Sequence, residues 1–251
     1  MAKQNGIIKL RGSLGGINFF KSGEDHLARE ASSVSASRIA NDPAYQRTRE
    51  NNMEFGRAGK AGKLIRDAFR PLLQQVKGRY LTSQLLSAIL RVIRTDEVNA
   101  RGQRRLIDGQ MELLEGFNFG DAAKLTSSLF IPYTASIDRP GGKFTVTLPS
   151  FVSAQSIASP PSATHAKLVV GAANIDFEAG AVMATGEDSA IVPLNNVAIP
   201  DVTLTAVTQP APSGQLFLVL GVQFGQMVNQ VLYPLNNGAF NALAIVKVQP
   251  N

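Results

Sequence analysis

The sequence contains no cysteine and only two histidines, His26 and His165, among its 251 residues. A chain without cysteine can form no disulfide, no thiolate metal site and no cysteine nucleophile. Neither histidine has a second ligand at the spacing that metal sites use. No G-x-S-x-G sequence marks a nucleophilic serine. The sequence therefore predicts no metal centre, no cofactor and no small-molecule substrate, and we expect a protein that is not an enzyme.

One acidic pair keeps an enzymatic alternative open. Asp176 and Glu178 share a face of a predicted strand and could serve as acid and base or bind calcium. No ligand-loop pattern and no identifiable partner group surround them, so we rank this alternative third.

Long apolar runs are also missing. A membrane-spanning helix needs about 18 or more consecutive apolar residues, and the sequence has no such run, so we expect no membrane span. The N-terminal residues MAKQNGIIKLRGSLGG lack the apolar core of a secretory signal. We therefore expect synthesis in the cytoplasm, with a final place in a particle or filament.

The composition is that of a globular protein, but its charge is unevenly distributed. Hydrophobic residues make up 44% and charged residues 18% of the chain. Residues 1–106 hold 20 Lys and Arg against 9 Asp and Glu, a net charge of +11, whereas residues 107–251 hold 5 against 10, a net charge of −5. Opposite charges on the two halves favour head-to-tail contact between copies.

The central feature of the basic half is a predicted helix over residues 41–76, with its glycines and Pro71 as the expected places of a break or bend. Asn41 and Asp42 are candidate caps, and Pro43 suits the first turn. A glycine costs roughly 1 kcal/mol in a helix interior relative to alanine, so several together need a reason. The glycines in question are Gly56, Gly59 and Gly62. We predict that they let a second helix or another molecule pack closely.

A basic stripe runs between these glycines and continues toward the start of the helix. Its candidate phosphate contacts are Arg47, Arg49, Arg57, Lys60, Lys63 and Arg66. The sequence GRAGKAGKL fails as a nucleotide-binding loop, because its spacing is wrong, Leu64 stands where Ser or Thr is required, and no strand precedes it. The remaining alternative to packing is contact with nucleic acid phosphates, which requires no base recognition.

A second helix is expected over residues 79–99, with Gly78 as the stop of the first. Two helices joined by so short a connection predict an antiparallel helical hairpin. Residues 31–40 read as a linker, and residues 107–119 read as a brief helical connection. We take residues 31–119 as a basic helical domain.

The first 30 residues predict a β-ribbon arm. GIIKLRG, GGINFFKS and HLARE read as short strands separated by turns. A ribbon of this size is marginal alone in water, so it must cover its own chain or contact another copy. For the second case the predicted assembly contacts are Ile7, Ile8, Leu10, Ile17, Phe19 and Phe20.

Residues 120–251 predict an antiparallel β-sandwich of the Ig-like or jelly-roll-like kind. The clearest hairpin joins residues 133–137 to residues 143–148 through the turn RPGG. Further strands are predicted at 165–178, 181–185, 189–194, 202–208, 215–228, 230–235 and 240–248. The segments GQLFLVLGVQF and AFNALAIVKV are apolar on both faces, which is typical of a covered central strand or of an interface.

Three stretches together resemble a family of uncharacterised bacterial proteins known from Bacteroidota genomes. They are GIIKLRGSLGGINFFKS, NDPAYQRTRENNMEFGRAGKAGKLIR and NNGAFNALAIVKV. The resemblance implies an N-terminal hairpin, a helical segment and a C-terminal β domain, and it implies no established activity.

The sequence thus predicts an α+β protein that acts as a structural subunit and associates with itself into a filament, tube or shell. The arm and the helical hairpin would make the contacts. The alternative is a coat-like or nucleoid-type protein whose basic helices bind nucleic acid.

Overall fold

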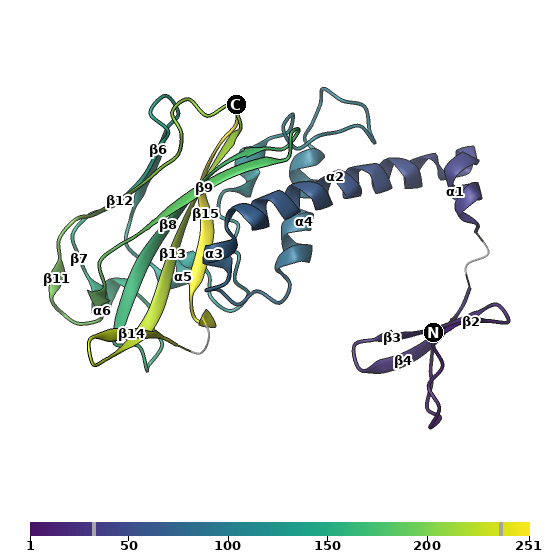
Figure 1. The fold of residues 1–251 in the computed structure, drawn as a ribbon, viewed down its shortest axis with the longest axis horizontal. Helices are drawn as coiled ribbons and strands as arrows, with labels where there is room; N and C mark the ends of the chain where they lie inside the picture. The colour runs from purple at the N-terminus through teal and green to yellow at the C-terminus, as the bar shows by residue number, and fades with distance from the viewer. Residues whose placement is uncertain (32–33, 236–237) are drawn as a thin grey trace. The chain divides into compact units, whose positions relative to one another are not determined.

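The computed structural model describes residues 1–31, 34–235 and 238–251 (Figure 1). The chain divides into two compact units, Met1–Asn51 and Asn52–Asn251, and each is described here by itself. Helices are combined with antiparallel sheets, which agrees with the α+β class. Within the described residues, no helix is both long enough and apolar enough to cross a membrane.

The first unit contains a small antiparallel sheet. Its strands are β1 (Ala2–Lys3), β2 (Gly12–Leu14), β3 (Ile17–Ser22) and β4 (Asp25–Glu30), in the order β1-β4-β3-β2. The strand predicted for GIIKLRG is wrong over residues 6–11. Gln4 closes this segment into a loop, because its side-chain oxygen accepts the N–H of Leu10 at 2.8 Å and its amide nitrogen donates to the Leu10 carbonyl at 3.3 Å. These bonds replace the ladder partners that a strand would need.

The predicted linker at 31–40 contains helix α1 (Ala36–Asn41). The hydroxyl of Ser35 caps this helix by accepting the N–H of Arg38 at 3.1 Å. Asp42 then starts the 3₁₀ turn η1 (Pro43–Tyr45), where its carboxylate accepts the N–H of Ala44. Asn41, a predicted cap, is instead the last residue of α1, because the cap of η1 falls on Asp42.

The helix predicted over residues 41–76 breaks beside Pro71, one of the places where the sequence predicts a break or bend. Helix α2 (Gln46–Ala68) runs through all three glycines and ends before Phe69, and the short helix α3 (Arg70–Leu73) follows. Pro71 has no N–H to donate to the preceding turn, so the helical bonding is interrupted here. Further along lie α4 (Leu81–Ile93) and the 3₁₀ turn η2 (Met111–Leu114), the latter in the predicted helical connection.

Helices α2 and α4 pack against each other by crossing, which differs from the antiparallel hairpin that the sequence predicts (Figure 1). Gly62 is buried at the contact, where a Cβ would lie 3.4 Å from the Cδ1 of Ile89. Leu85 is the other close neighbour, at 3.8 Å or more. Gly62 therefore lies directly against α4, a partner that the sequence pattern did not specify.

The second unit contains a curled six-stranded sheet and two smaller sheets. The large sheet has the order β10-β8-β13-β14, with β9 beside β8 and β15 beside β13; a three-stranded sheet has the order β12-β6-β5, and β7 pairs with β11. The strands are β5 (Thr134–Asp138), β6 (Lys143–Leu148), β7 (Phe151–Val152), β8 (His165–Asp176), β9 (Ala181–Asp188), β10 (Val192–Pro193), β11 (Ala198–Ile199), β12 (Val202–Val207), β13 (Gln215–Val228), β14 (Val231–Pro234) and β15 (Ala242–Gln249). Two short helices complete the unit, α5 (Leu125–Ser128) and α6 (Ser153–Ser156).

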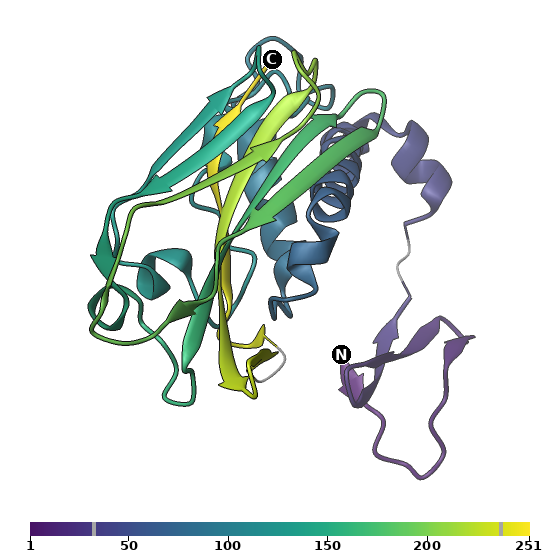
Figure 2. The same ribbon diagram turned by 60° about the vertical axis from the view of Figure 1, so that its left-hand side comes forward.

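The long strands β8 and β13 are buried on both faces. Val169, Phe217 and Val219 belong to a hydrophobic cluster shared with α2 and α4, whereas Leu168 and Leu218 belong to a second cluster shared with β6 and β12. The helices lie on one side of these strands and the smaller sheet on the other (Figure 2). Of the two segments that are apolar on both faces, GQLFLVLGVQF lies in β13, and AFNALAIVKV lies in β15, whose residues also belong to both clusters. Both segments are covered by their own chain, and they give no argument for an interface.

Gly171 on β8 lets the end of the helical segment approach the sheet. A Cβ there would lie 2.6 Å from the Cδ1 of Leu72, 2.8 Å from the Cγ2 of Val219 and 3.2 Å from the Cδ1 of Phe69. Because the helices and the large sheet share one core, residues 58–119 and the sheet pack as one body in the second unit. The separate domains predicted at 31–119 and 120–251 stay a prediction.

A buried carboxylate organises the loop after α4. Asp96 is 1% exposed and accepts the N–H groups of Val98, Asn99 and Arg105 at 2.8 to 3.0 Å. The side-chain amide of Asn99 donates to it as well, at 2.9 Å. Burial by itself would raise the pKa of Asp96, but these hydrogen bonds outweigh it and lower the pKa below the ordinary value.

Replacing this carboxylate should destabilise the protein. Asp96→Ala leaves several partly buried donors unpaired, and we expect a loss of about 3 kcal/mol in the free energy of unfolding, measured by urea denaturation at neutral pH. The lowered folded-state pKa makes the contribution of Asp96 complete above its ordinary pKa, and this contribution disappears as the pH falls through the folded value. The difference between native protein and variant should therefore shrink in acid. Glu97→Ala, at the exposed neighbour, is the control; equal losses in both variants would contradict the prediction.

Candidate functional site

The N-terminal sheet exposes apolar side chains to solvent. In the loop before β2, Ile7 is fully exposed and Ile8 is 80% exposed, and Leu14 at the end of β2 is 71% exposed. Leu10 and Ile17 are exposed to a smaller extent. Among the described residues 1–31, no side chain is buried, and neither hydrophobic cluster includes a residue before Ala58. This sheet therefore has no hydrophobic core of its own.

The two phenylalanines of β3 lie on opposite faces and are half-buried. Phe19 stands opposite Ala28 on β4, and Phe20 stands opposite Leu27. The guanidinium of Arg29 lies over the ring of Phe20 at 5.3 Å from its centroid. Phe19 and Phe20 thus have partners within the unit, which leaves the two isoleucines of the loop as the most accessible of the predicted contacts.

Leu14 is an exposed apolar residue that sequence reasoning missed. It pairs with Ile17 across β2 and β3, so the two side chains stand on the same face as Phe19. The alternation of Ile17 and Phe19 predicts this face, but the position of Leu14 opposite Ile17 follows only from the register of the pair. The three residues form a continuous apolar strip on one face of the sheet.

Three of the six cations in the basic stripe of α2 form hydrogen bonds or ion pairs with other residues of the same chain. Arg47 forms an ion pair with Glu50 at 2.9 Å, and Arg49 donates to the carbonyls of Ile39 and Asp42. Arg57 donates to the carbonyl of Gly102 at 2.5 Å and to the side chain of Gln103 at 2.7 Å.

The remaining half of the stripe stays open to solvent. Lys60 and Lys63 are exposed, Arg66 is half-buried, and none of these three side chains has a hydrogen bond or ion pair within the described residues. The hydrogen bond from Arg70 holds the pKa of Asp67 below its ordinary value, and the charges of Lys63 and Arg66 add to that effect. These three cations are the part of the predicted stripe that is available to a phosphate.

The three glycines of α2 face different surroundings. Gly62 packs against α4, whereas a Cβ at Gly56 or Gly59 would meet no atom within 4 Å. Of these three glycines, therefore, Gly62 alone contacts another helix within the described residues. A packing role for Gly56 and Gly59 requires another molecule and stays a prediction.

The acidic pair of the enzymatic alternative is tied up in local structure. Glu178 forms an ion pair with Arg105 at 2.6 Å, and the carboxylate of Asp176 accepts the N–H groups of Glu178 and Ala179 at 2.9 Å. In the part of the chain that the structure describes, no three His, Asp or Glu residues gather to hold a metal ion. The geometry thus offers no developed catalytic arrangement at this pair.

Comparison with protein-family models and with curated proteins finds no match to this chain. The resemblance to a Bacteroidota family stays a prediction, and function has to be argued from the residues themselves.

Substituting the two open glycines separates stability from association. Gly56→Ala and Gly59→Ala should each raise the free energy of unfolding by about 1 kcal/mol, because alanine favours the helix and meets no neighbour there. Thermal denaturation of dilute protein measures this. If these glycines pack against another copy, the double variant should also assemble less than the native protein, as measured by light scattering. A variant that is both more stable and fully able to assemble would exclude that packing role.

Proposed function

We propose that this protein is a non-enzymatic structural subunit that associates with itself into an ordered assembly through its N-terminal sheet. The observation that carries the proposal is the exposure of Ile7, Ile8, Leu14 and Ile17 on a sheet that buries no side chain of its own. Solvated apolar side chains in such a sheet contribute nothing to its stability. Burying one isoleucine against a partner contributes about 1.5 to 3 kcal/mol, so a few of them support a specific contact.

The distribution of charge supports a particular arrangement of copies. The basic N-terminal half and the acidic C-terminal half carry net charges of +11 and −5. Contact between unlike surfaces on successive copies would bring these charges together, and a head-to-tail contact builds a ring or an open filament according to its geometry. A filament, tube or shell is consistent with this arrangement, and the cytoplasm is the expected place of synthesis.

For the fold of the second unit, the finer proposal is an Ig-like or jelly-roll-like sandwich. Support comes from the second hydrophobic cluster, in which residues of β8 and β13 pack with Phe144, Val146 and Leu204 of the smaller sheet. Such double-sheet units are rigid, and this property suits a building block of an assembly.

The assembly proposal is tested by charging the loop of the N-terminal sheet. Ile7→Glu combined with Ile8→Glu should give a monomer in sedimentation velocity experiments at concentrations where the native protein assembles. Because both side chains are exposed, the variant should keep the native circular dichroism and thermal midpoint.

The matched control is Val197→Glu, which charges an exposed apolar residue of the second unit and should leave assembly unchanged. A native protein that is monomeric at high concentration, with no particles in negative-stain electron microscopy, would exclude the proposal. Equal assembly of the loop variant and the native protein would exclude the N-terminal sheet as the contact.

Nucleic acid binding is the second candidate function, in the form of a coat-like or nucleoid-type protein. The observation that favours it is the group of unpaired cations on one helix, namely Lys60, Lys63 and Arg66. Neutralised phosphates release counterions, so such binding weakens steeply with salt.

The second candidate predicts a measurable salt dependence. Replacing Lys60, Lys63 and Arg66 together by glutamine should reduce the slope of log K against log salt by up to about 3 for duplex DNA, since each phosphate contact contributes about 0.9. Lys143→Gln, on β6, is the control with no expected effect. Binding that is absent, or insensitive to salt, for both duplex and single strands would dismiss this candidate.

A further inference from the structure

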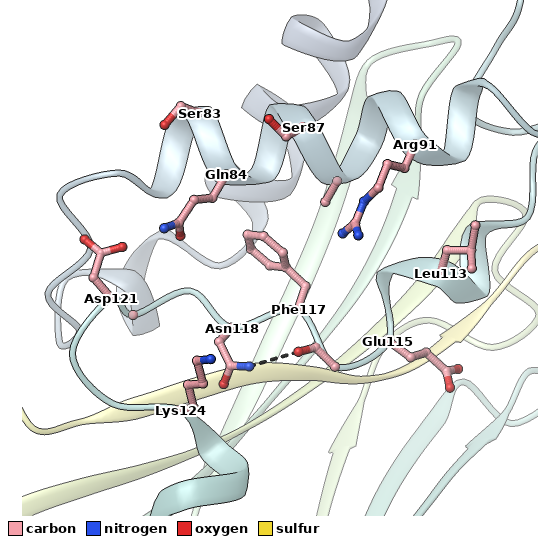
Figure 3. A pocket seen from close by; sticks show the side chains of 13 residues that line it. Ser83, Gln84, Ser87, Arg91, Leu113, Glu115, Phe117, Asn118, Asp121 and Lys124 are labelled. Carbon is pink, nitrogen blue, oxygen red and sulfur yellow. Dashed lines mark hydrogen bonds between the residues drawn. The ribbon is translucent and has the colours of Figure 1, made fainter.

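A groove of about 700 Å³ separates α4 from the segment at residues 113–124 (Figure 3). Gln84, Ser87 and Arg91 line it from the helix, where their spacing of three and four residues puts them on one face. Asn118 and Lys124 line the opposite side, and the ring of Phe117 stands between α4 and Asn118. All of these residues belong to the second unit.

One side of the groove is the edge of a sheet. The N–H of Phe119 donates to the carbonyl of Leu243, and the N–H of Ile245 donates to the carbonyl of Phe117, both at 2.9 Å. Asn118 lies between these bonds, opposite Ala244 of β15. In an antiparallel pair of this type, the N–H and C=O of the middle residue point away from the partner strand. Within the described residues, no group bonds to the N–H or C=O of Asn118, so a short strand edge is open.

The side chain of Asn118 holds this edge in position. Its amide nitrogen donates to the carbonyl of Gly116 at 2.9 Å, and its oxygen accepts the N–H of Leu125 at 2.8 Å. The main-chain groups of Asn118 are therefore fixed in place before any ligand arrives. A fixed edge loses little conformational entropy on binding.

Two cations without an ion pair face the groove. The side chains of Arg91 and Lys124 project toward it from opposite sides and have no hydrogen bond or ion pair within the described residues. The two carboxylates that also line the groove each accept a backbone N–H. Asp121 accepts the N–H of Tyr80 at 3.1 Å; Glu115 accepts the N–H of Val248 at 2.9 Å and lies 3.5 Å from Lys247.

We propose that this groove binds an extended acidic peptide segment of a partner protein, which adds as a strand beside Asn118. The main-chain groups of Asn118 bond to the backbone of the peptide, and Arg91 and Lys124 bind its carboxylates from the two sides. Gln84 and Ser87 offer further hydrogen bonds from α4. Strand addition at a sheet edge supplies affinity from the backbone and selectivity from the side chains. This site is independent of the assembly contact at the N-terminal sheet.

The cations and the strand edge of the groove require different features of the ligand, namely negative charge and a free backbone. A free anion would satisfy Arg91 and Lys124 without using the strand edge. A neutral strand would use the edge of Asn118 without the cations. Only a ligand with both features uses the whole groove, so each feature can be removed from the ligand in turn.

The test uses a six-residue peptide of alternating Glu and Val, acetylated and amidated, titrated into the ¹⁵N-labelled full chain. We expect saturable changes in the NMR resonances of the Asn118 amide and of α4. Replacing Glu by Gln, or methylating a central backbone nitrogen, should each weaken binding about tenfold, the change that corresponds to a lost interaction of 1.4 kcal/mol.

Variants of the protein complete the test. Arg91→Gln combined with Lys124→Gln should weaken binding of the Glu peptide about tenfold, a loss typical of charge-assisted bonds. The matched control is Arg94→Gln combined with Lys143→Gln, which removes the same charge from outside the groove and should leave the affinity unchanged. No saturable binding up to several millimolar peptide would overturn the proposal. So would affinity that is insensitive to N-methylation or equal in the two double variants.

Discussion

The second unit depends on the burial of both faces of β8 and β13. Each strand sends alternate side chains into two separate hydrophobic clusters, one under the helices and one under the smaller sheet. A shift of one residue in the β8–β13 register would exchange the two sets, so both clusters specify the same pairing. Gly171 adds a steric condition, because only a residue without a side chain lets Leu72 and Phe69 lie on the strand. The helices are thus part of the same core as the sheet.

The strands of this unit could be predicted because their apolar patterns are local. Residues 143–148 alternate in burial as their sequence alternates, and the turn after Asp138 returns the chain to pair with β5. The continuous apolar character of GQLFLVLGVQF and AFNALAIVKV predicts the strands β13 and β15. The two-residue strands β7 and β11 were missed, since so short a pair has no periodicity to detect. The sequence also does not predict which elements cover the two faces of β8 and β13, because these contacts join residues that are distant in sequence.

The contrast between local patterns and contacts distant in sequence also applies to the basic helix. The spacing of Arg57, Lys60 and Lys63 predicts a stripe, but it cannot reveal that Arg57 donates to the carbonyl of Gly102, which lies 45 residues away. Likewise, the three glycines look equivalent in the sequence, yet only Gly62 meets another helix. The error at residues 6–11 has a similar origin, because Gln4 bonds to the backbone of Leu10 and no apolar pattern records such a bond.

The second unit covers its own long apolar strands, so residues elsewhere must account for any association between copies. Since its long apolar strands are covered by its own helices and sheet, they give no reason to invoke a second copy. The exposed residues of the N-terminal sheet retain that reason. The apolar part of their contact would be only weakly sensitive to salt, unlike the attraction between the charged halves. The groove beside α4 is different in kind, because Arg91 and Lys124 make any binding there electrostatic in part. Salt should therefore weaken peptide capture at the groove more than apolar contacts at the N-terminal sheet, which makes the two surfaces separable in one preparation of the protein.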